Sequence, residues 1–408
     1  MSPDVALSDR ERAIVNAFQG GFPVVERPFE PAAAALRERG IDVSATALLE
    51  TIRTLDEREI ISRFGPLIDA EEIGGTAVLV AASAPDDRLE EVAEAINARR
   101  EVAHNYERDH PELNLWFVVS VADEDRVSEV LSAIEAETGT ETYAMPKRRE
   151  FELEATFPVD GPLSDAVGGE RTEGTDDAPD REHVGVDLSR LGSGRFDGFE
   201  DFEDFEDFEG SGDDPGPDTD PTTEPGRDHT GTPDSLSPAE RDLVLEVQDG
   251  LPLTETPYAD VAAAIGREPA WVRGTIRRFD REGKIRRIGI VPNHYALGYT
   301  ENGMTVWDVS DDLVPEVGRA VGSLPFVTHC YERPRHDGVW SYNLFAMVHG
   351  RTEAECHRRI DRVYELVADH EEITEDEWGT LFSTRILKKS GIRLPERVEA
   401  NTRRTSPQ

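Results

Sequence analysis

The chain has little cysteine and no long apolar segment. Only two cysteines, Cys330 and Cys356, occur in 408 residues, and neither lies in a CxxC pair or in a His/Cys cluster with zinc-ligand spacing. A disulfide framework is therefore excluded, and a reducing compartment fits. There is no run of about 18 apolar residues, and the start MSPDVALSDRERAIV lacks the basic and apolar regions of a signal peptide. We expect a soluble, cytoplasmic protein without a membrane partner.

Basic residues are scarce beside acidic ones, and lysine is rare beside arginine. The formal net charge is −41, and the segment 158–235 holds 24 acidic and 5 basic residues, so its net charge of −19 leaves −22 on the other 330 residues. The acidity therefore extends beyond that segment. Concentrated salt screens such self-repulsion, so we expect a halophilic protein whose surface repels nucleic acid unless a local basic patch overrides it.

Blocks of the sequence occur twice in the same order. LSDRERAIVNAFQGGFPVVERPFEPAAAAL from Leu7 is answered by LSPAERDLVLEVQDGLPLTETPYADVAAAI from Leu236, an offset of 229. HNYER at His104 is answered by HCYER at His329, and NLWF at Asn114 by NLFA at Asn343, with offsets of 225 and 229. The chain is therefore a fusion of two related halves.

Each half has the same predicted order of elements. Helical periodicity over its first 60-odd residues indicates a helix, a helix-turn-helix and a short β-wing, and the remainder alternates as β-α-β-β-α-β, the ferredoxin-like pattern. The predicted fold class is α+β, a duplicated unit of winged helix-turn-helix and ferredoxin-like domain. The predicted boundaries are 1–65 and 66–157 for the two domains of the first half, 158–235 for an acidic disordered linker, 236–291 and 292–396 for the domains of the second half, and 397–408 for a tail. The phenylalanines of the linker's FED repeat could form a docking motif.

The helix-turn-helix suggests DNA binding, but the two copies differ in charge. Arg53 of the first is surrounded by acidic residues such as Glu50, whereas the second carries Arg273, Arg277, Arg278, Arg286 and Arg287. A protein with one basic and one acidic copy would bind a symmetric operator poorly, so we do not expect DNA as a partner.

The two HxYER motifs are the strongest candidates for a ligand site. In an extended segment the side chains at positions i, i+2 and i+4 point to one side, which brings an imidazole, a phenol and a cation together. A purely structural alternative pairs each arginine with a nearby acid such as Glu107 or Glu332. Because the triplet occurs in both halves, we favour a ligand site formed by His104, Tyr106, Arg108, His329, Tyr331 and Arg333.

Weaker candidates lie around these motifs. Lone His336 and His349 are more often structural, and no glycine-rich phosphate loop, Ser-His-Asp arrangement or metal cluster is present. Basic residues on the final strand of each half could hold a polyanion, although a solvated edge is the simpler interpretation. They are Lys147, Arg148, Arg149, Arg385, Lys388 and Lys389.

These motifs resemble a known family. The domain pattern is similar to that of Lrp/AsnC regulators, and HNYER with NLWF, NGMTVWDV with HCYERP, YNLFAMVHGRT and LFSTRILKK resemble the siroheme decarboxylases. The first half is similar to one subunit of the heterodimeric enzyme and the second half to the other. The resemblance implies removal of two carbon dioxide molecules from the acetate groups at C12 and C18 of siroheme, which gives 12,18-didecarboxysiroheme on the alternative heme pathway.

The resemblance also implies roles for residues. The HxYER triplets would be catalytic, with His329 or His104 as an axial ligand of the siroheme iron or a proton donor. The polycarboxylate substrate would be held by polar and cationic side chains. The iron belongs to the substrate, so neither an added cofactor nor a structural metal is expected. The expected substrate-binding residues are Asn114, Trp116, Lys147, Arg148, Asn343, Arg385 and Lys388.

Two other functions stay open at this point. One is a transcriptional regulator of the Lrp/AsnC class that senses a small ligand or heme, and the other is a tetrapyrrole carrier without turnover. In each case the two halves would pair within one chain, since the linker is long enough, and the whole chain could dimerise through its sheets.

Overall fold

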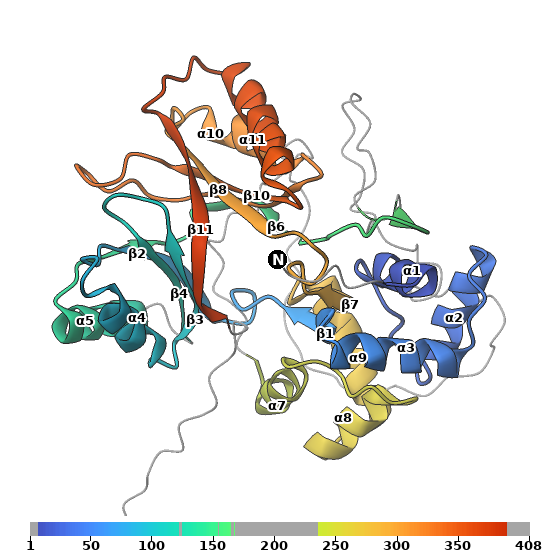
Figure 1. Ribbon diagram of the computed structural model, residues 1–408. Coiled ribbons are helices and arrows are strands. Elements are labelled where there is room, and N and C mark those ends of the chain that lie inside the picture. Colours follow the sequence, from blue (N-terminus) through green and yellow to red (C-terminus); the bar gives the residue numbers. More distant parts are fainter. Residues whose placement is uncertain (1–6, 122–124, 154, 165–166, 168–235, 390–408) are drawn as a thin grey trace, which may run out of the picture.

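The two halves of the chain fold into one helical part and one sheet-rich part (Figure 1). The structure is a computed structural model that describes residues 7–121, 125–153, 155–164, 167 and 236–389. Most of the predicted linker, with its FED repeat, and the tail lie outside the described residues. No helix in the described ranges is long and apolar enough to cross a membrane.

Each half begins with three helices and one strand, as predicted. Ser8 with Glu11 and Ser237 with Glu240 form capping boxes that begin the first helix of each half, so the repeated LS-x-x-E sequence has the same local role twice. These elements are α1 (Asp9–Phe18), α2 (Phe29–Glu38), α3 (Ala45–Glu57) and β1 (Ile61–Ile68), then α7 (Pro238–Val247), α8 (Pro257–Ile265), α9 (Pro269–Arg281) and β7 (Ile285–Pro292).

The two helix-turn-helix units form one body. Strands β1 and β7 pair antiparallel, and a single apolar core contains side chains from both units. Gly65 lies opposite Gly289 in this pair, and a Cβ on Gly289 would approach the Phe18 carbonyl oxygen to 2.3 Å. The predicted wing is therefore one strand from each half, and close backbone packing at its centre requires glycine.

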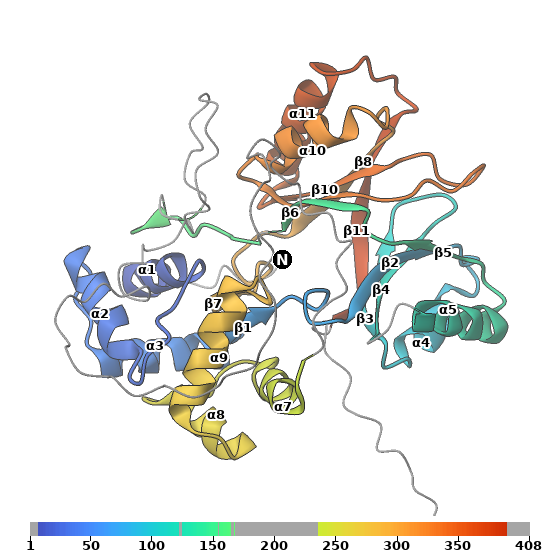
Figure 2. The ribbon, with the colours of Figure 1, turned by 180° about the vertical axis from the view of Figure 1, so that it is seen from behind.

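The ligand domains have the predicted β-α-β-β-α-β order. The first contains β2 (Thr76–Ala82), α4 (Leu89–Asn97), β3 (Val102–Arg108), β4 (Leu115–Val121), α5 (Asp125–Thr138), β5 (Thr142–Met145) and β6 (Arg149–Leu153). The second contains β8 (Glu301–Trp307), α10 (Val314–Gly322), β9 (Val327–Glu332), β10 (Leu344–Gly350), α11 (Glu353–Ala368) and β11 (Trp378–Lys389). Helices cover one face of each sheet (Figure 2).

The final strands join the two ligand domains into one sheet, in the order β5-β2-β4-β3-β11-β8-β10-β9-β6. The first part of β11 pairs with β8 of its own half and the second part with β3 of the other half. In the same way β6, which the sequence assigns to the first ligand domain, pairs with β9 of the second. A buried cluster that includes Ala81, Trp116, Met304 and Phe345 contains side chains of both halves from the faces that the helices leave uncovered. The two ligand domains contribute one such face each to the continuous sheet. The region between these two faces is called the inter-sheet space below, and each of the two is called an inter-sheet face.

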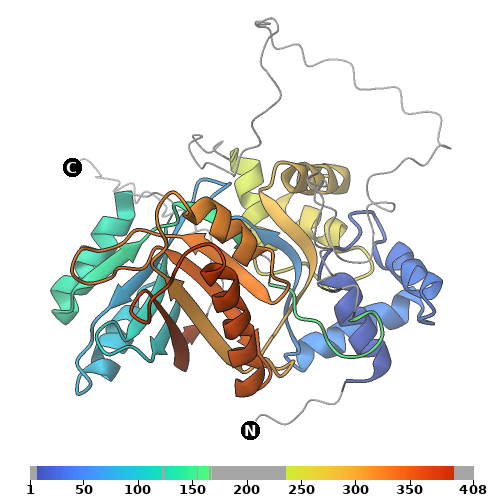
Figure 3. The same ribbon diagram turned by 90° about the horizontal axis from the view of Figure 1, so that it is seen from above.

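The predicted linker begins later than the sequence indicates. Residues 155–164, called the strap below, pack on α1 and on the second half (Figure 3). The fully buried side chain of Asn16 donates to the carbonyl oxygens of Val159 and Pro162 at 2.8 and 3.0 Å and accepts from the Val159 amide at 2.9 Å. Gln19 forms two similar bonds with Phe157 at 2.8 and 2.9 Å. Val159 and Pro162, which the prediction placed in the linker, are therefore part of the fold, because the buried Asn16 amide satisfies their backbone groups.

Candidate active site

The two HxYER motifs lie on β3 and β9, where Arg333 directly follows the last residue of β9, and their His, Tyr and Arg side chains are on the inter-sheet face. The intervening residues point to the helices: Asn105 donates to the Asn97 side chain of α4 at 3.0 Å, and Cys330 packs in the core under α10. Alternation along a strand then places the three motif side chains on the opposite face. Phe345 and Met347, the neighbours of Tyr331 and His329 on β10, belong to the inter-sheet cluster.

The two arginines of the motifs bind the other half of the chain. Arg108 Nη1 donates to the Leu381 carbonyl oxygen at 2.9 Å, and Arg333 Nη1 donates to the Met145 carbonyl oxygen. Burial lowers the pKa of both arginines to about 10. Each guanidinium also lies over the tyrosine ring of its own motif, at 5.6 Å in the first half and 4.9 Å in the second.

The alternative in which the motif arginines pair with Glu107 or Glu332 is wrong, because these acids have other partners. Glu107 pairs with Arg385 at 2.9 Å, and Glu332 pairs with Arg149 at 3.5 Å. The acids of the HxYER motifs thus bind cations of the strand from the other half, and the motif arginines are left to bind backbone carbonyls.

A charged cluster lies next to Tyr331 and joins all parts of the molecule. Lys147 lies 5.3 Å from the Tyr331 ring centre and pairs with Glu71 and Glu150 at 2.7 and 2.8 Å. Arg286 of β7 pairs with Glu150 at 2.7 Å and with Asp69 at 2.6 Å. Burial raises the pKa of Glu150, but the hydrogen bonds and charges of Arg286 and Lys147 outweigh it and lower the pKa to about 2.

The first-half motif has a tyrosine from the second half as a neighbour. Tyr295 follows β7, and its pKa is raised to about 12 by burial and by the nearby Tyr106. Burial likewise raises the pKa of Tyr106, although the charge of Arg108 opposes the shift. Each motif is thus completed by residues of the opposite half, a feature that the sequence does not indicate.

The second-half motif continues into a row of polar side chains across β9, β10 and β8. His329 Nδ1 and Thr328 Oγ1 are 2.8 Å apart, Thr328 Oγ1 and His349 Nε2 are 2.9 Å apart, and His349 Nδ1 contacts Asn302 Oδ1. Burial lowers the pKa of His329 to about 4 and that of His349 well below its usual value. Both imidazoles are therefore neutral near pH 7.

His349 was a minor candidate in the sequence, and Thr328 and Asn302 were not candidates at all. A residue-by-residue comparison of the two halves would have indicated them, because all three differ from their counterparts. Next to this row, a cavity of about 220 Å³ is lined by Thr328 and His349, with Phe157 of the strap and Phe326 among its apolar walls.

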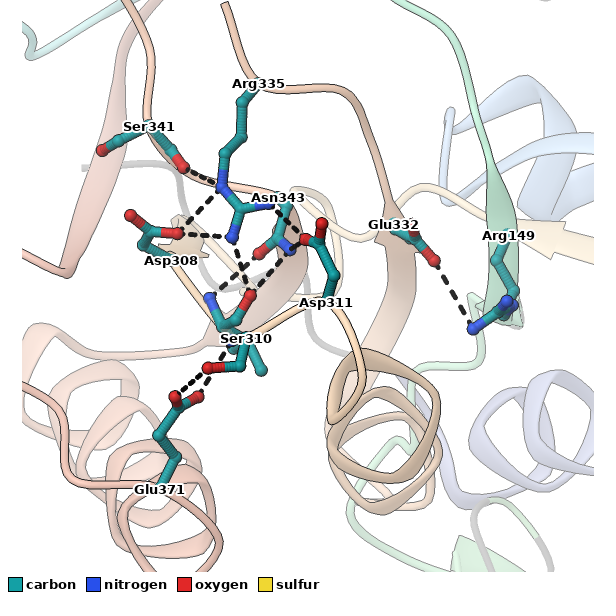
Figure 4. A network of polar contacts seen from close by, with 10 residues as sticks. Arg149, Asp308, Ser310, Asp311, Glu332, Arg335, Ser341, Asn343 and Glu371 are labelled. Carbon is teal, nitrogen blue, oxygen red and sulfur yellow. Dashed lines mark hydrogen bonds and ion pairs between the residues drawn. The ribbon is translucent and has the colours of Figure 1, made fainter.

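Several predicted substrate-binding residues have structural partners instead. Asn343 accepts from the Val309 amide at 3.0 Å and donates to the Val309 carbonyl at 2.9 Å, next to an ion pair of Arg335 with Asp308 (Figure 4). Asn114 bonds Ala84 in the same way at 2.9 and 2.8 Å.

Trp116 and His336 also have structural contacts. Trp116 is 1% exposed in the inter-sheet cluster and donates to the Leu113 carbonyl at 2.7 Å. His336 Nε2 lies 2.9 Å from the Ala144 carbonyl.

The basic residues of the final strands also differ in whether they lie near a motif or have other partners. Lys147 lies beside the Tyr331 ring, whereas Arg148 is exposed and Arg385 pairs with Glu90 and Glu107 at the surface. Lys388 donates to two backbone carbonyls at the end of α4, both at 2.8 Å. Arg149 and Arg385 thus contact the glutamates of the two motifs, and Lys147 contacts a motif tyrosine. No group of three or more metal-ligating side chains was found among those residues.

Known proteins resemble both the domains and the whole chain. The AsnC-like ligand binding domain family matches residues 72–152 and 296–388, and the siroheme decarboxylase NirDL-like HTH domain family matches residues 11–61 and 240–286. The chain is 49% identical over 159 residues to the siroheme decarboxylase NirH subunit of Pseudomonas aeruginosa, which covers 39% of this chain and 91% of that subunit. It is 28% identical over 392 residues to the siroheme decarboxylase NirDL subunit of Paracoccus denitrificans, which covers 96% of this chain and 99% of that subunit.

The fold agrees with a solved structure over nearly the whole chain. The crystal structure of the siroheme decarboxylase NirDL matches with a TM-score of 0.61 at 23% identity and covers 95% of each chain. Both domain families match both halves of the chain, and the fused NirDL-like relative aligns over 96% of it. The chain therefore belongs to the siroheme decarboxylase family, as a fusion of two related halves.

Proposed function

We propose that this chain is a siroheme decarboxylase that removes carbon dioxide from the acetate groups at C12 and C18 of siroheme and forms 12,18-didecarboxysiroheme. The observation that carries the proposal is the paired HxYER motif on the inter-sheet face, in a chain related over its whole length to siroheme decarboxylases. A relative's crystal structure contains an iron-uroporphyrin III analogue, which is also a polycarboxylate tetrapyrrole. The substrate brings its own iron, so no added cofactor is needed.

The surroundings of the motifs suit loss of carbon dioxide. A carboxylate that is moved from water to a buried, mainly apolar site is destabilised, and this lowers the barrier to breaking its bond to the neighbouring carbon. The electron pair stays on that carbon, conjugated with the macrocycle, and a proton must then reach it to form the methyl group. His329 is the group that we assign to this proton transfer, because it lies on the inter-sheet face beside Tyr331.

The cations around the second-half motif would orient the remaining carboxylates. Lys147 and Arg286 are held there by Glu71, Glu150 and Asp69. Substrate carboxylates can share these cations with the acidic side chains, since an ammonium and a guanidinium group each have several N–H donors. These two cations support the proposal, because they lie beside the motif in a chain whose net charge is −41.

The helix-turn-helix units are better explained as the contact that joins the two halves of the chain than as DNA-binding domains. Arg277 Nε donates to the Val24 carbonyl at 3.0 Å, and Arg53 Nε donates to the Leu253 carbonyl at 2.8 Å, so each unit binds the other. Arg278 pairs with Glu240. Arginines that are engaged in this way are not available to DNA phosphates.

The test is anaerobic incubation of the purified full chain with siroheme in high salt, followed by mass spectrometry of the tetrapyrrole. Two successive losses of the mass of one carbon dioxide are expected. Tight binding with an unchanged mass would show a carrier instead. Salt-sensitive binding to a DNA duplex, without turnover, would support the regulator.

A further inference from the structure

The polar row of the second half has a defined hydrogen-bond direction. Asn302 Nδ2 donates to the Thr300 carbonyl at 3.2 Å, so the Oδ1 atom of the same amide faces His349 and accepts from Nδ1–H. His349 is neutral, and its Nε2 must then accept from the Thr328 hydroxyl at 2.9 Å. The Thr328 oxygen in turn accepts from His329 Nδ1–H at 2.8 Å.

This direction determines which nitrogen of His329 is available. With Nδ1 protonated and bound to Thr328, the Nε2 atom of the neutral ring carries a lone pair. No residue of the described ranges forms a hydrogen bond with that atom. If Nε2 takes up a proton, every hydrogen bond of the row keeps its donor and acceptor, so the row needs no rearrangement during proton transfer.

The described strands of the first half contain no equivalent row. His349 pairs with Asn302 across β10 and β8, and Ser120 pairs with Ala77 at the equivalent place in β4 and β2. Both HxYER strands also have a β-bulge next to the histidine. The extra residue of the bulge is Thr328 in the second half and Ala103 in the first, so the first half lacks the hydroxyl, the imidazole and the amide.

We propose that Asn302, His349 and Thr328 are positioning residues that lock His329 as the Nδ1–H tautomer and present its Nε2 lone pair to the inter-sheet space. The inference rests on the proposed decarboxylase function and deepens it, because it assigns the proton transfer to the second half. In each turnover Nε2 takes up one proton from water and delivers it to the carbon that retains the electron pair after carbon dioxide leaves. The reaction then balances without an oxidant or a reductant.

The test compares two substitutions of Thr328 in the full chain. Thr328→Val keeps the shape of the side chain and removes the hydroxyl, whereas Thr328→Ser keeps the hydroxyl. We expect Thr328→Val to lower kcat for siroheme about 10- to 100-fold with little change in KM, as for the loss of other positioning hydrogen bonds, and Thr328→Ser to retain most of the activity. Ser120→Ala, at the first-half position equivalent to His349, is the matched control and should leave kcat unchanged.

A second readout does not depend on turnover. Nitrogen-15 NMR of histidine-labelled protein should show His329 protonated at Nδ1 in the wild type and in Thr328→Ser, and a mixture of tautomers in Thr328→Val. Protonation of wild-type His329 at Nε2, or an unchanged kcat in folded Thr328→Val, would overturn the proposal. A wild type that leaves siroheme intact but shows the expected tautomer would refute the proposed function and not the positioning row.

Discussion

Arg108 Nη1 donates a hydrogen bond to the Leu381 carbonyl oxygen at 2.9 Å, which links the HxYER strand of the first half to the last strand of the second. Arg333 makes the equivalent contact with Met145 in the opposite direction. Each motif therefore depends on the other half for its geometry. The arginines hold the two ligand domains together, and the imidazole and phenol are left for chemistry.

Replacement of Arg108 tests this link. Arg108→Ala removes a buried, charge-assisted hydrogen bond and the packing of the guanidinium on Tyr106, so we expect the free energy of unfolding to fall by about 2–3 kcal/mol. The measurement is denaturant unfolding at constant salt. Arg126→Ala is the control, because that side chain is 47% exposed and its ion pairs are at the surface, where a change within about 0.5 kcal/mol is expected. Equal midpoints for both variants would contradict the link.

Replacement of His329 tests its chemical role. His329→Ala should lower kcat for siroheme decarboxylation by about 100-fold or more, the usual contribution of a positioned acid or base. Circular dichroism should show an unchanged fold. His357→Ala on the exposed face of α11 is the matched control and should behave as the wild type. Turnover of His329→Ala at the wild-type rate would remove this residue from the site.

Glu150 predicts a dependence of stability on pH. Its pKa is about 2 in the folded chain and 4.5 without a shift, so its ion pairs stabilise the fold fully above pH 4.5 and this stabilisation is lost as the pH falls towards 2. The contribution at neutral pH is about 3 kcal/mol. Glu150→Gln should therefore be less stable than the wild type at pH 7, and the difference should vanish near pH 2. Glu365→Gln, in an exposed pair with Arg362, should change stability little at either pH. A constant difference for Glu150→Gln across this range would be inconsistent with the cause given.

The hydrogen bonds between Asn16 and the strap predict a local change in stability when Asn16 is replaced. Asn16→Leu places at this position the residue type found in the second half, Leu245, and removes three hydrogen bonds to Val159 and Pro162. We expect the free energy of local opening to fall by about 2 kcal/mol. This corresponds to about 30-fold faster hydrogen exchange at the Val159 amide. Exposed Glu246→Ala should have no such effect. Exchange at the wild-type rate in Asn16→Leu would show that other contacts hold the strap.

Much of the fold could be predicted because its signals are local. The capping boxes at Ser8 and Ser237 and the periodicity of the strands depend on residues close in sequence, and both halves give the same prediction. The alternation of HNYER and HCYER also predicted which side chains share a face. Residues 158–164 of the strap were assigned to the linker because their order comes from Asn16, which lies 143 residues from Val159 in the sequence.

The candidate site was predicted less completely. The sequence indicated His329 and Tyr331, but it also gave Asn114, Asn343 and Trp116 as substrate contacts, whereas the structure shows them bonded to their own loops or buried in the core. Polar residues near a motif in sequence can satisfy backbone groups instead of a ligand, and sequence does not distinguish the two.

The sequence by itself determined the duplication, the class of each domain and the face on which the motifs lie, because these follow from repeats and from the period of the side chains. Only the tertiary structure decided which strands cross between the halves, so that Arg108 meets Leu381 and Lys147 meets Tyr331. Only the structure placed Asn302, His349 and Thr328 in one row with His329. The physical reason is that these contacts join strands from distant parts of the chain, and their register is set by packing of the whole sheet and not by any local preference.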